Sequence, residues 1–193
     1  MIVALVLAAG RGRRFSKSDN KLFAPFRGRP LLRHAVDAAL SSRVAETVVV
    51  TGFDAERVER ELAGHPLRIV RNDEYEEGMA SSLRAGLRHT SDADGAVILL
   101  GDMPLTSSAL IDRLIETFEA GAAAAVAPTH GGRRGNPVLL GRALFPLVAR
   151  LSGDTGARAL LRARVDVREL EIDDASVILD VDAESDLTAL NER

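Results

Sequence analysis

A glycine-rich stretch with several basic residues follows the first apolar run of the sequence. Residues 2–9 are all apolar, Gly10-Arg-Gly-Arg-Arg14 follows them directly, and Lys21 stands a short distance further on. Small residues let backbone N–H groups approach a phosphate closely, and the side chains of Arg14 and Lys21 can neutralise its charge. We therefore expect a phosphate site here, with a solvated basic turn between strand and helix as the alternative.

This stretch does not match the two best-known phosphate-binding loops. Gly10 and Gly12 begin a G-x-G-x-x-G pattern, but Phe15 stands where the third glycine of the dinucleotide fingerprint would be. The sequence also contains no G-x-x-x-x-G-K-[ST], the pattern of P-loop kinases. The site is therefore expected to belong to another class of phosphate-binding protein.

Two aspartates follow apolar runs in distant parts of the sequence. Asp102 comes after residues 95–100, and Asp182 ends Leu179-Asp-Val-Asp182. Mg²⁺ commonly takes one or two protein carboxylates and completes its shell with phosphate oxygens and water, so this pair would suit it. Alternation along a strand would put Asp180 on the same face as Asp182, as a partner of the metal ligand. The alternative is that Asp102 and Asp182 cap the helices that follow them.

The pattern of apolar residues predicts the elements that must position these side chains. Strands are expected at residues 2–9, 46–51, 67–70, 95–100, 122–127, 167–172 and 177–181. Helices are expected at residues 31–40, 55–62, 81–87, 108–118, 143–151, 156–163 and 184–190, and a loop at residues 129–137. This alternation predicts a doubly wound α/β fold with a mostly parallel sheet. Ligands of such sheets bind beyond the carboxyl ends of the strands, where the basic stretch and both aspartates are expected.

Composition limits the class of protein. The 193 residues are expected to form a single domain. The absence of cysteine excludes a disulfide framework and a thiol nucleophile, and the formal net charge of -3 argues against a nucleic-acid-coating protein. The first apolar run is shorter than the roughly 20 residues of a membrane span and has no basic segment before it, so we expect a soluble cytoplasmic protein.

A series of motifs along nearly the whole chain resembles the MobA-like nucleotidyltransferases, and within them most closely the molybdenum cofactor cytidylyltransferases. The motifs are Leu7-Ala-Ala-Gly-x-Gly-x-Arg-Phe15 with Lys21, Gly78-Met-Ala-Ser-Ser-Leu83, Gly101-Asp-Met-Pro104, Gly135-Asn-Pro137, Gly153-Asp-Thr-Gly-Ala-Arg158 and Leu179-Asp-Val-Asp182. The resemblance implies a Rossmann-like nucleotide-diphospho-sugar transferase fold of the GT-A type. It also implies one nucleotidyltransferase domain over residues 1–193.

The resemblance further implies a role for individual residues. Those that line the nucleotide would be Leu7, Ala8, Ala9 and Gly10, with Asn72, Gly78 and Ser82 near the base or ribose. Arg14 and Lys21 would hold the phosphates and, with Asp102, act in catalysis, while Asp102 and Asp182 would bind Mg²⁺. Asn136, Pro137 and Arg158 would face the acceptor.

The implied reaction joins CMP from CTP to a phosphate-bearing acceptor, molybdopterin or molybdenum cofactor, with release of pyrophosphate. Ala9 favours CTP over GTP, because guanylyl-transferring relatives usually have glycine there. An acceptor phosphate is already ionised, so no general base is needed and a structural role is expected for each of the four histidines. Lys21→Ala is expected to lower turnover by orders of magnitude and to leave thermal stability almost unchanged.

The chain departs from the family pattern near the phosphate site. Gly12 stands in place of the usual serine, Ser16 in place of the glycine after Phe15, and residues 16–20 lengthen the approach to Lys21. These changes affect how the triphosphate is bound and do not alter the expected class of reaction.

Three alternative functions remain open on the sequence. The first keeps the chemistry but uses GTP or another acceptor, such as a sugar phosphate, methylerythritol phosphate or phospholactate. The second is a dinucleotide-dependent oxidoreductase, disfavoured by Phe15 and by Thr51-Gly52, where an acidic residue would be expected. The third is a non-catalytic protein that binds molybdenum cofactor and hands it to a molybdoenzyme. No nucleic-acid or membrane partner is expected.

Overall fold

The fold is built around an eight-stranded sheet with short apolar strands in its centre. The computed structural model describes residues 1–12, 15, 20–90, 92–121, 123–162 and 164–192. The strand order is β10-β7-β9-β6-β1-β4-β5, and β8 pairs with β7. The bounds are β1 Ile2–Ala8, β4 Glu46–Thr51, β5 Arg68–Arg71, β6 Gly95–Leu100, β7 Ala125–His130, β8 Arg133–Arg134, β9 Val138–Gly141 and β10 Val167–Glu171.

Most neighbouring strands run parallel, which confirms the predicted α/β class. β1 lies parallel to both β4 and β6, β4 to β5, and β7 to β10. β9 runs antiparallel between β6 and β7, and β8 forms an antiparallel pair with the end of β7. Neither β8 nor β9 was expected from the sequence, because two and four residues are too short for a period to show.

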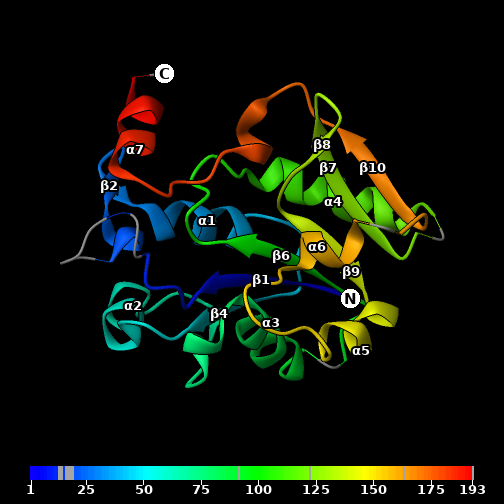
Figure 1. Cartoon of the computed structure of the whole chain (residues 1–193), viewed down its shortest axis with the longest axis horizontal. Helices are drawn as coiled ribbons and strands as arrows, with labels where there is room; N and C mark the ends of the chain where they lie inside the picture. Colours follow the sequence, from blue (N-terminus) through cyan, green and yellow to red (C-terminus); the bar gives the residue numbers. More distant parts are fainter. Residues whose placement is uncertain (13–14, 16–19, 91, 122, 163, 193) are drawn as a thin grey trace.

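Helices cover both faces of this sheet. The cluster on one face includes side chains of α1 (Leu31–Leu40), α2 (Ala55–Glu61) and α4 (Ser108–Glu119). The cluster on the other face includes α3 (Met79–Arg88), α5 (Phe145–Val148) and α6 (Ala157–Leu161), and Figure 1 shows α1 and α4 across the sheet from α3 and α5. The doubly wound arrangement is therefore confirmed.

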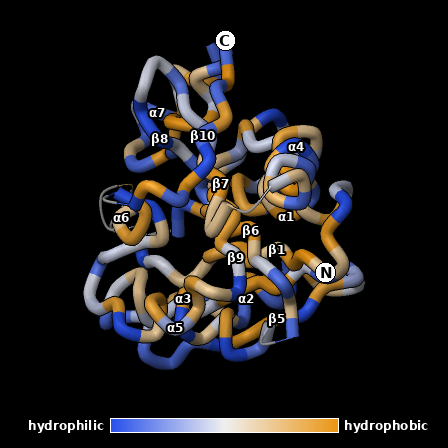
Figure 2. The backbone as a smooth tube through the Cα atoms, turned by 90° about the vertical axis from the view of Figure 1, so that its right-hand side faces the viewer, coloured by the Kyte–Doolittle hydropathy of each residue, from blue (hydrophilic) through white to orange (hydrophobic). Residues whose placement is uncertain are grey.

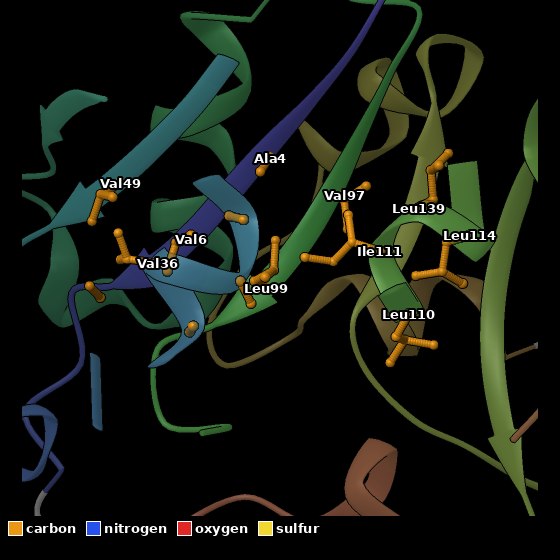
Figure 3. Packing of buried hydrophobic residues seen from close by; sticks show 14 of the residues in the cluster. Ala4, Val6, Val36, Val49, Val97, Leu99, Leu110, Ile111, Leu114 and Leu139 are labelled. Carbon is orange, nitrogen blue, oxygen red and sulfur yellow. The ribbon is translucent and has the colours of Figure 1, made fainter. Parts of the chain in front are cut away.

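The alternation of side chains along β1 explains how one apolar strand serves both faces. Ala4 and Val6 belong to one cluster and Val3 and Leu5 to the other, and all four are fully buried. Figure 3 shows the first of these clusters, with β1 side chains facing those of α1. Hydrophobic colour runs along the central strands in Figure 2. Burial on both faces holds the carboxyl end of β1 in a fixed place.

The segment expected as a strand at residues 177–181 is not one. A 3-10 helix, η4 (Ala175–Ile178), occupies its start, and the remainder has no strand partner among the described residues. The backbone of Val181 is instead bonded to the phosphate-site region: its N–H donates to the carbonyl oxygen of Asp102, at 3.1 Å. The prediction was wrong because these backbone groups bond across the molecule rather than along the sheet.

The C-terminal segment returns to the N-terminal part of the chain. Helix α7 (Glu184–Asn191) lies beside the small hairpin of β2 (Pro25–Phe26) and β3 (Arg29–Pro30), as Figure 1 shows for α7 and β2. Val181 and Leu190 share a buried cluster there with Phe26 and Leu31. Within the described ranges, no helix has the length and apolarity needed to cross a membrane.

Candidate active site

A cavity of about 520 Å³ opens where the carboxyl ends of β1 and β6 lie side by side. The chain runs outward from β1 through β4 to β5 and then returns to β6 on the other side of β1, so this is the point where the strand order reverses. The lining residues from the two strand ends are Leu7, Ala8, Ala9, Gly10, Leu100 and Asp102. Four residues expected to line a nucleotide, Leu7 to Gly10, therefore lie together in this wall.

Lys21 lies at the bottom of the cavity and donates to three oxygens. Its Nζ is 2.6 Å from Oδ2 of Asp102, 3.2 Å from Oδ1 of Asp182 and 2.9 Å from the carbonyl oxygen of Val181. The exposed fractions of the Lys21 and Asp102 side chains are 11% and 17%, against 39% for Asp182. The structure thus brings together a lysine and two carboxylates that are far apart in the sequence.

Short-range structure aims Lys21 inward. It begins the 3-10 helix η1 (Lys21–Phe23), whose first turn is capped by Asn20 Oδ1 accepting from the N–H of Leu22. Gly12 lies against the aliphatic part of this side chain: a Cβ on Gly12 would be 2.8 Å from Cγ of Lys21, and its φ is +58°. Glycine in place of the usual serine therefore matches the path of Lys21.

The two aspartates suit a divalent cation. Oδ1 of Asp102 is buried and has no hydrogen-bond partner among the described residues, and Asp102 is one of the residues that line the cavity, so this carboxylate keeps an oxygen that a cation could use. Neither aspartate caps a helix: Ser107 caps α4, and Asp186 accepts from the N–H groups of Asp182 and Ala183 at the start of α7. In the part of the chain that the structure describes, no three His, Cys, Asp or Glu residues gather into a metal cluster, so the cation would have two protein carboxylates.

The carboxylates also alter the ionisation of their neighbours. Burial is the largest influence on Lys21 and disfavours its charge, but Asp102 and Asp182 together outweigh it, so the pKa of Lys21 is raised. Desolvation, followed by the charges of Asp102 and Asp182, raises the pKa of Asp180, which also lines the cavity. The charges of Asp102 and Asp182 contribute to both shifts, and burial is the largest influence on the pKa of Asp180.

Glycines allow two loops to close one side of the cavity. Gly78 has a φ of +99°, and a Cβ there would be 2.4 Å from the carbonyl carbon of Gly153. A Cβ on Gly156 would be 2.6 Å from Sδ of Met79. The N–H of Ala80 also donates to the carbonyl oxygen of Gly153, at 3.0 Å. The start of α3 is thereby packed against residues 153–156.

Asn72 supports this wall from behind and is not among the described residues that line the first cavity. Its amide donates to the hydroxyls of Ser81 and Ser82, at 2.8 and 3.0 Å, and the side chain is buried. Ser82 and Gly78 do line the cavity. Of the three residues expected near the base or ribose, two therefore reach the space and Asn72 orients one of them.

A second cavity of about 600 Å³ adjoins the first and shares Met79, Leu100, Asp154 and Asp180 with it. Asn136 and Arg158, which were expected to face the acceptor, line this second space. Pro137, the next residue, is buried and is not among the described residues that line the second cavity. Gly135 allows this turn to pack on η4, since a Cβ there would be 2.1 Å from the carbonyl oxygen of Val177.

Comparison with known proteins places this site in a family. The model of the MobA-like NTP transferase domain matches residues 4–168 of the chain. The chain belongs to this family. It is a nucleotidyltransferase, as the name of the matched domain states. The resemblance stated from the sequence is thus confirmed at the level of the family.

Two curated relatives of this MobA-like protein differ in name, and only the first name states an activity. Nicotine blue oxidoreductase of Paenarthrobacter nicotinovorans is 32% identical over 169 residues, which cover 84% of this chain and 82% of that protein. The bifunctional protein GlmU of Rhizorhabdus wittichii is 36% identical over 143 residues, 73% of this chain. This match covers only 31% of the length of GlmU.

Solved structures share the fold along the whole MobA-like chain. Rv0371c of Mycobacterium tuberculosis H37Rv is 32% identical with a TM-score of 0.89, and the match covers 100% of this chain and 97% of that one. A structure of that protein in complex with manganese is 30% identical with a TM-score of 0.85, covering 99% and 98%. A nucleotidyl transferase from Methanothermobacter is 27% identical with a TM-score of 0.86, covering 100% and 96%.

The MobA-like site also contains residues that the sequence patterns did not single out. Arg11 lies over the rings of Phe53 and Tyr75 and forms an ion pair with Glu76 at 2.7 Å, at the rim of the first cavity. Gly52 makes room for Tyr75, because a Cβ there would be 2.5 Å from Cβ of the tyrosine. The one sequence signal that could have pointed to this group is that Tyr75 is the only tyrosine of the chain. Arg14, expected to bind phosphate, lies outside the described residues.

Proposed function

We propose that this nucleotidyltransferase transfers CMP from CTP to a phosphate group of a small acceptor, molybdopterin or molybdenum cofactor, with Mg²⁺ and with release of pyrophosphate. One observation carries the proposal. Lys21 and the carboxylates of Asp102 and Asp182 meet at the strand ends beside a cavity, and Asp102 keeps one buried oxygen without a partner. Residues 1–193 would act as one catalytic unit.

The residues of the first cavity would bind the nucleotide. Leu7 to Gly10 would lie along the nucleoside and its α-phosphate, with Gly78 and Ser82 across from them. Arg14 and Lys21 would hold the phosphates, and Lys21 is already charged and oriented by its three acceptors. The methyl group of Ala9, which is buried at the cavity wall, supports the choice of CTP over the larger base of GTP.

The transfer itself needs no proton movement. An oxygen of the ionised acceptor phosphate forms a bond to the α-phosphorus of CTP, and the bond from that phosphorus to the bridging oxygen breaks. Pyrophosphate leaves with the electron pair of the broken bond. Asp102 and Asp182 would hold Mg²⁺, which when bound neutralises phosphate charge and aligns the two substrates. Lys21 would stabilise the charge that develops on the transferred group. Asn136 and Arg158 would orient the acceptor, and the buried Pro137 would hold the turn that carries Asn136.

The experiment compares Asp102→Asn with the wild-type chain in pyrophosphate release from CTP, molybdopterin and Mg²⁺. We expect release from the wild type to stop when the metal is chelated, and turnover of the variant to fall by about 100-fold or more. Asp173→Asn is the matched control, because Asp173 is exposed and outside both cavities. Turnover of Asp102→Asn close to that of the wild type would overturn the metal assignment.

The 32% identical relative named an oxidoreductase supports a second candidate, binding of a nicotinamide dinucleotide. The broken glycine pattern at Phe15 argues against it. A melting-temperature screen with CTP, GTP, NADH and NADPH, each with and without Mg²⁺, separates the two. A shift with CTP and Mg²⁺ supports nucleotidyl transfer, whereas a shift with NADH or NADPH alone supports the oxidoreductase. CTP binding without pyrophosphate release would indicate a molybdenum cofactor carrier.

A further inference from the structure

The charges around the second cavity are divided between its two ends. Asp154 and Asp180 line both cavities, and Asp102 and Asp182 line the first one. Arg133, Arg158 and Arg162 line the second cavity but not the first. The second cavity is therefore acidic towards the reaction centre and basic away from it.

These three arginines are available to a ligand. None of the three forms an ion pair with a described residue, and among the described residues their side chains make one hydrogen bond, from Arg158 to the carbonyl oxygen of Arg134 at 3.4 Å. Arg134 itself differs, because Glu169 holds its guanidinium at 2.7 Å and neutralises it. All three arginines are exposed on the side chain, so each can reach into the space without breaking an existing ion pair.

Apolar groups also line the second cavity. Ile98 and Leu100 come from β6, Ala157 from the first turn of α6, and Met79 from the first turn of α3. Met79 lies with its sulfur against Gly156 and is 37% exposed, so an unbranched thioether faces the space. This wall would cover the body of a molecule whose polar groups lie at its two ends.

We infer that the acceptor carries a second anionic group, separated by an apolar or planar body from the phosphate that reacts, and that Arg133 and Arg162 bind this second group. Arg158, in the first turn of α6, would complete the basic end. The inference rests on the proposed function, since it names the class of acceptor for the same site. Arginine is suited to this task because its planar fork donates two bonds to a carboxylate or phosphate.

The experiment uses two probes that differ only at one end, phenyl phosphate and 4-carboxyphenyl phosphate. Their affinities are measured by titration calorimetry in the presence of Mg²⁺ and a non-hydrolysable CTP analogue. We expect the carboxylated probe to bind the wild-type chain about tenfold more tightly at low salt, with the difference shrinking as ionic strength rises. R133Q/R162Q should remove this preference.

A double variant R88Q/R113Q is the matched control. Arg88 and Arg113 are exposed helix residues outside both cavities, and their replacement removes the same amount of charge. We expect this control to keep the tenfold preference and all three proteins to bind the CTP analogue equally. Equal affinity of the wild type for both probes, or equal loss in both double variants, would overturn the inference. Failure of the CTP analogue to bind, with the probe preference intact, would instead count against the proposed function alone.

Discussion

The two cavities on either side of Met79 hold their charges in different ways. In the first, Lys21 is buried and donates to three oxygens within 3.2 Å. In the second, Arg133, Arg158 and Arg162 are exposed and form no ion pair with a described residue. The first cavity lies on strand ends that are packed on both faces, whereas much of the second is formed by the β7–β9 region, residues 153–156 and α6.

This difference indicates which properties each region controls. Substitutions in the first cavity disturb a charge network that is part of the folded structure, so stability and activity should change together. Substitutions in the second remove side chains that act only when a ligand is present, so affinity should change alone. The following predictions test that separation.

The largest effect is expected for Lys21→Met, which keeps the aliphatic part of the side chain but removes its charge. Asp102 would lose its ion-pair partner, and its carboxylate would stay largely buried because only 17% of the side chain is exposed. We expect the free energy of unfolding to fall by about 2–3 kcal/mol and turnover by about 100-fold or more. The sequence led to the expectation that loss of Lys21 leaves stability almost unchanged. That expectation is corrected here because the sequence does not show that the Lys21 side chain is buried.

The stability of Lys21→Met can also be measured with a divalent cation present. Because the cation would neutralise Asp102 and Asp182, adding Mn²⁺ or Mg²⁺ should restore part of the lost stability of Lys21→Met without restoring turnover. Chemical denaturation with and without metal measures this. A variant as stable as the wild type in the absence of metal would show that the buried ion pair is not part of the folding energy.

An intermediate effect is expected for Gly78→Ala, at the junction of the two cavities. The left-handed φ and the contact of a Cβ with the backbone of Gly153 should together lower the free energy of unfolding by about 2 kcal/mol. Gly64→Ala is the control, because Gly64 has a φ of +83° but open space around it, and should lose only about 1 kcal/mol. Equal losses in the two variants, measured by denaturation, would mean that the contact with Gly153 contributes nothing.

The smallest effect on stability is expected for Arg158→Gln in the second cavity. The side chain is exposed and its one bond, to the carbonyl oxygen of Arg134, is long, so the free energy of unfolding should change by less than about 0.5 kcal/mol. The KM for the acceptor should rise several-fold while the KM for CTP stays constant. Steady-state kinetics with each substrate varied in turn would show this, and a matching rise in the KM for CTP would contradict the separation of the two cavities.

The sequence by itself determined the sheet strands that carry the first cavity and the family to which they belong. Residues 2–8 and 95–100 are continuous apolar runs, and only a strand buried on both faces explains their composition. The motifs at Gly10 to Lys21 and at Asp102 follow those strands directly. Their place at the carboxyl ends of the sheet therefore followed from local pattern and from the winding rule.

Only the tertiary structure decided how Asp182 and the second cavity are placed. Residues 177–181 look like a strand in the sequence, but the N–H and carbonyl groups of Val181 bond to Asp102 and Lys21 instead. The arginines of the second cavity come from an unexpected hairpin at β8 and from both ends of α6. Contacts between residues up to 161 positions apart leave no periodic trace in the sequence, because they depend on how whole elements pack and not on local spacing.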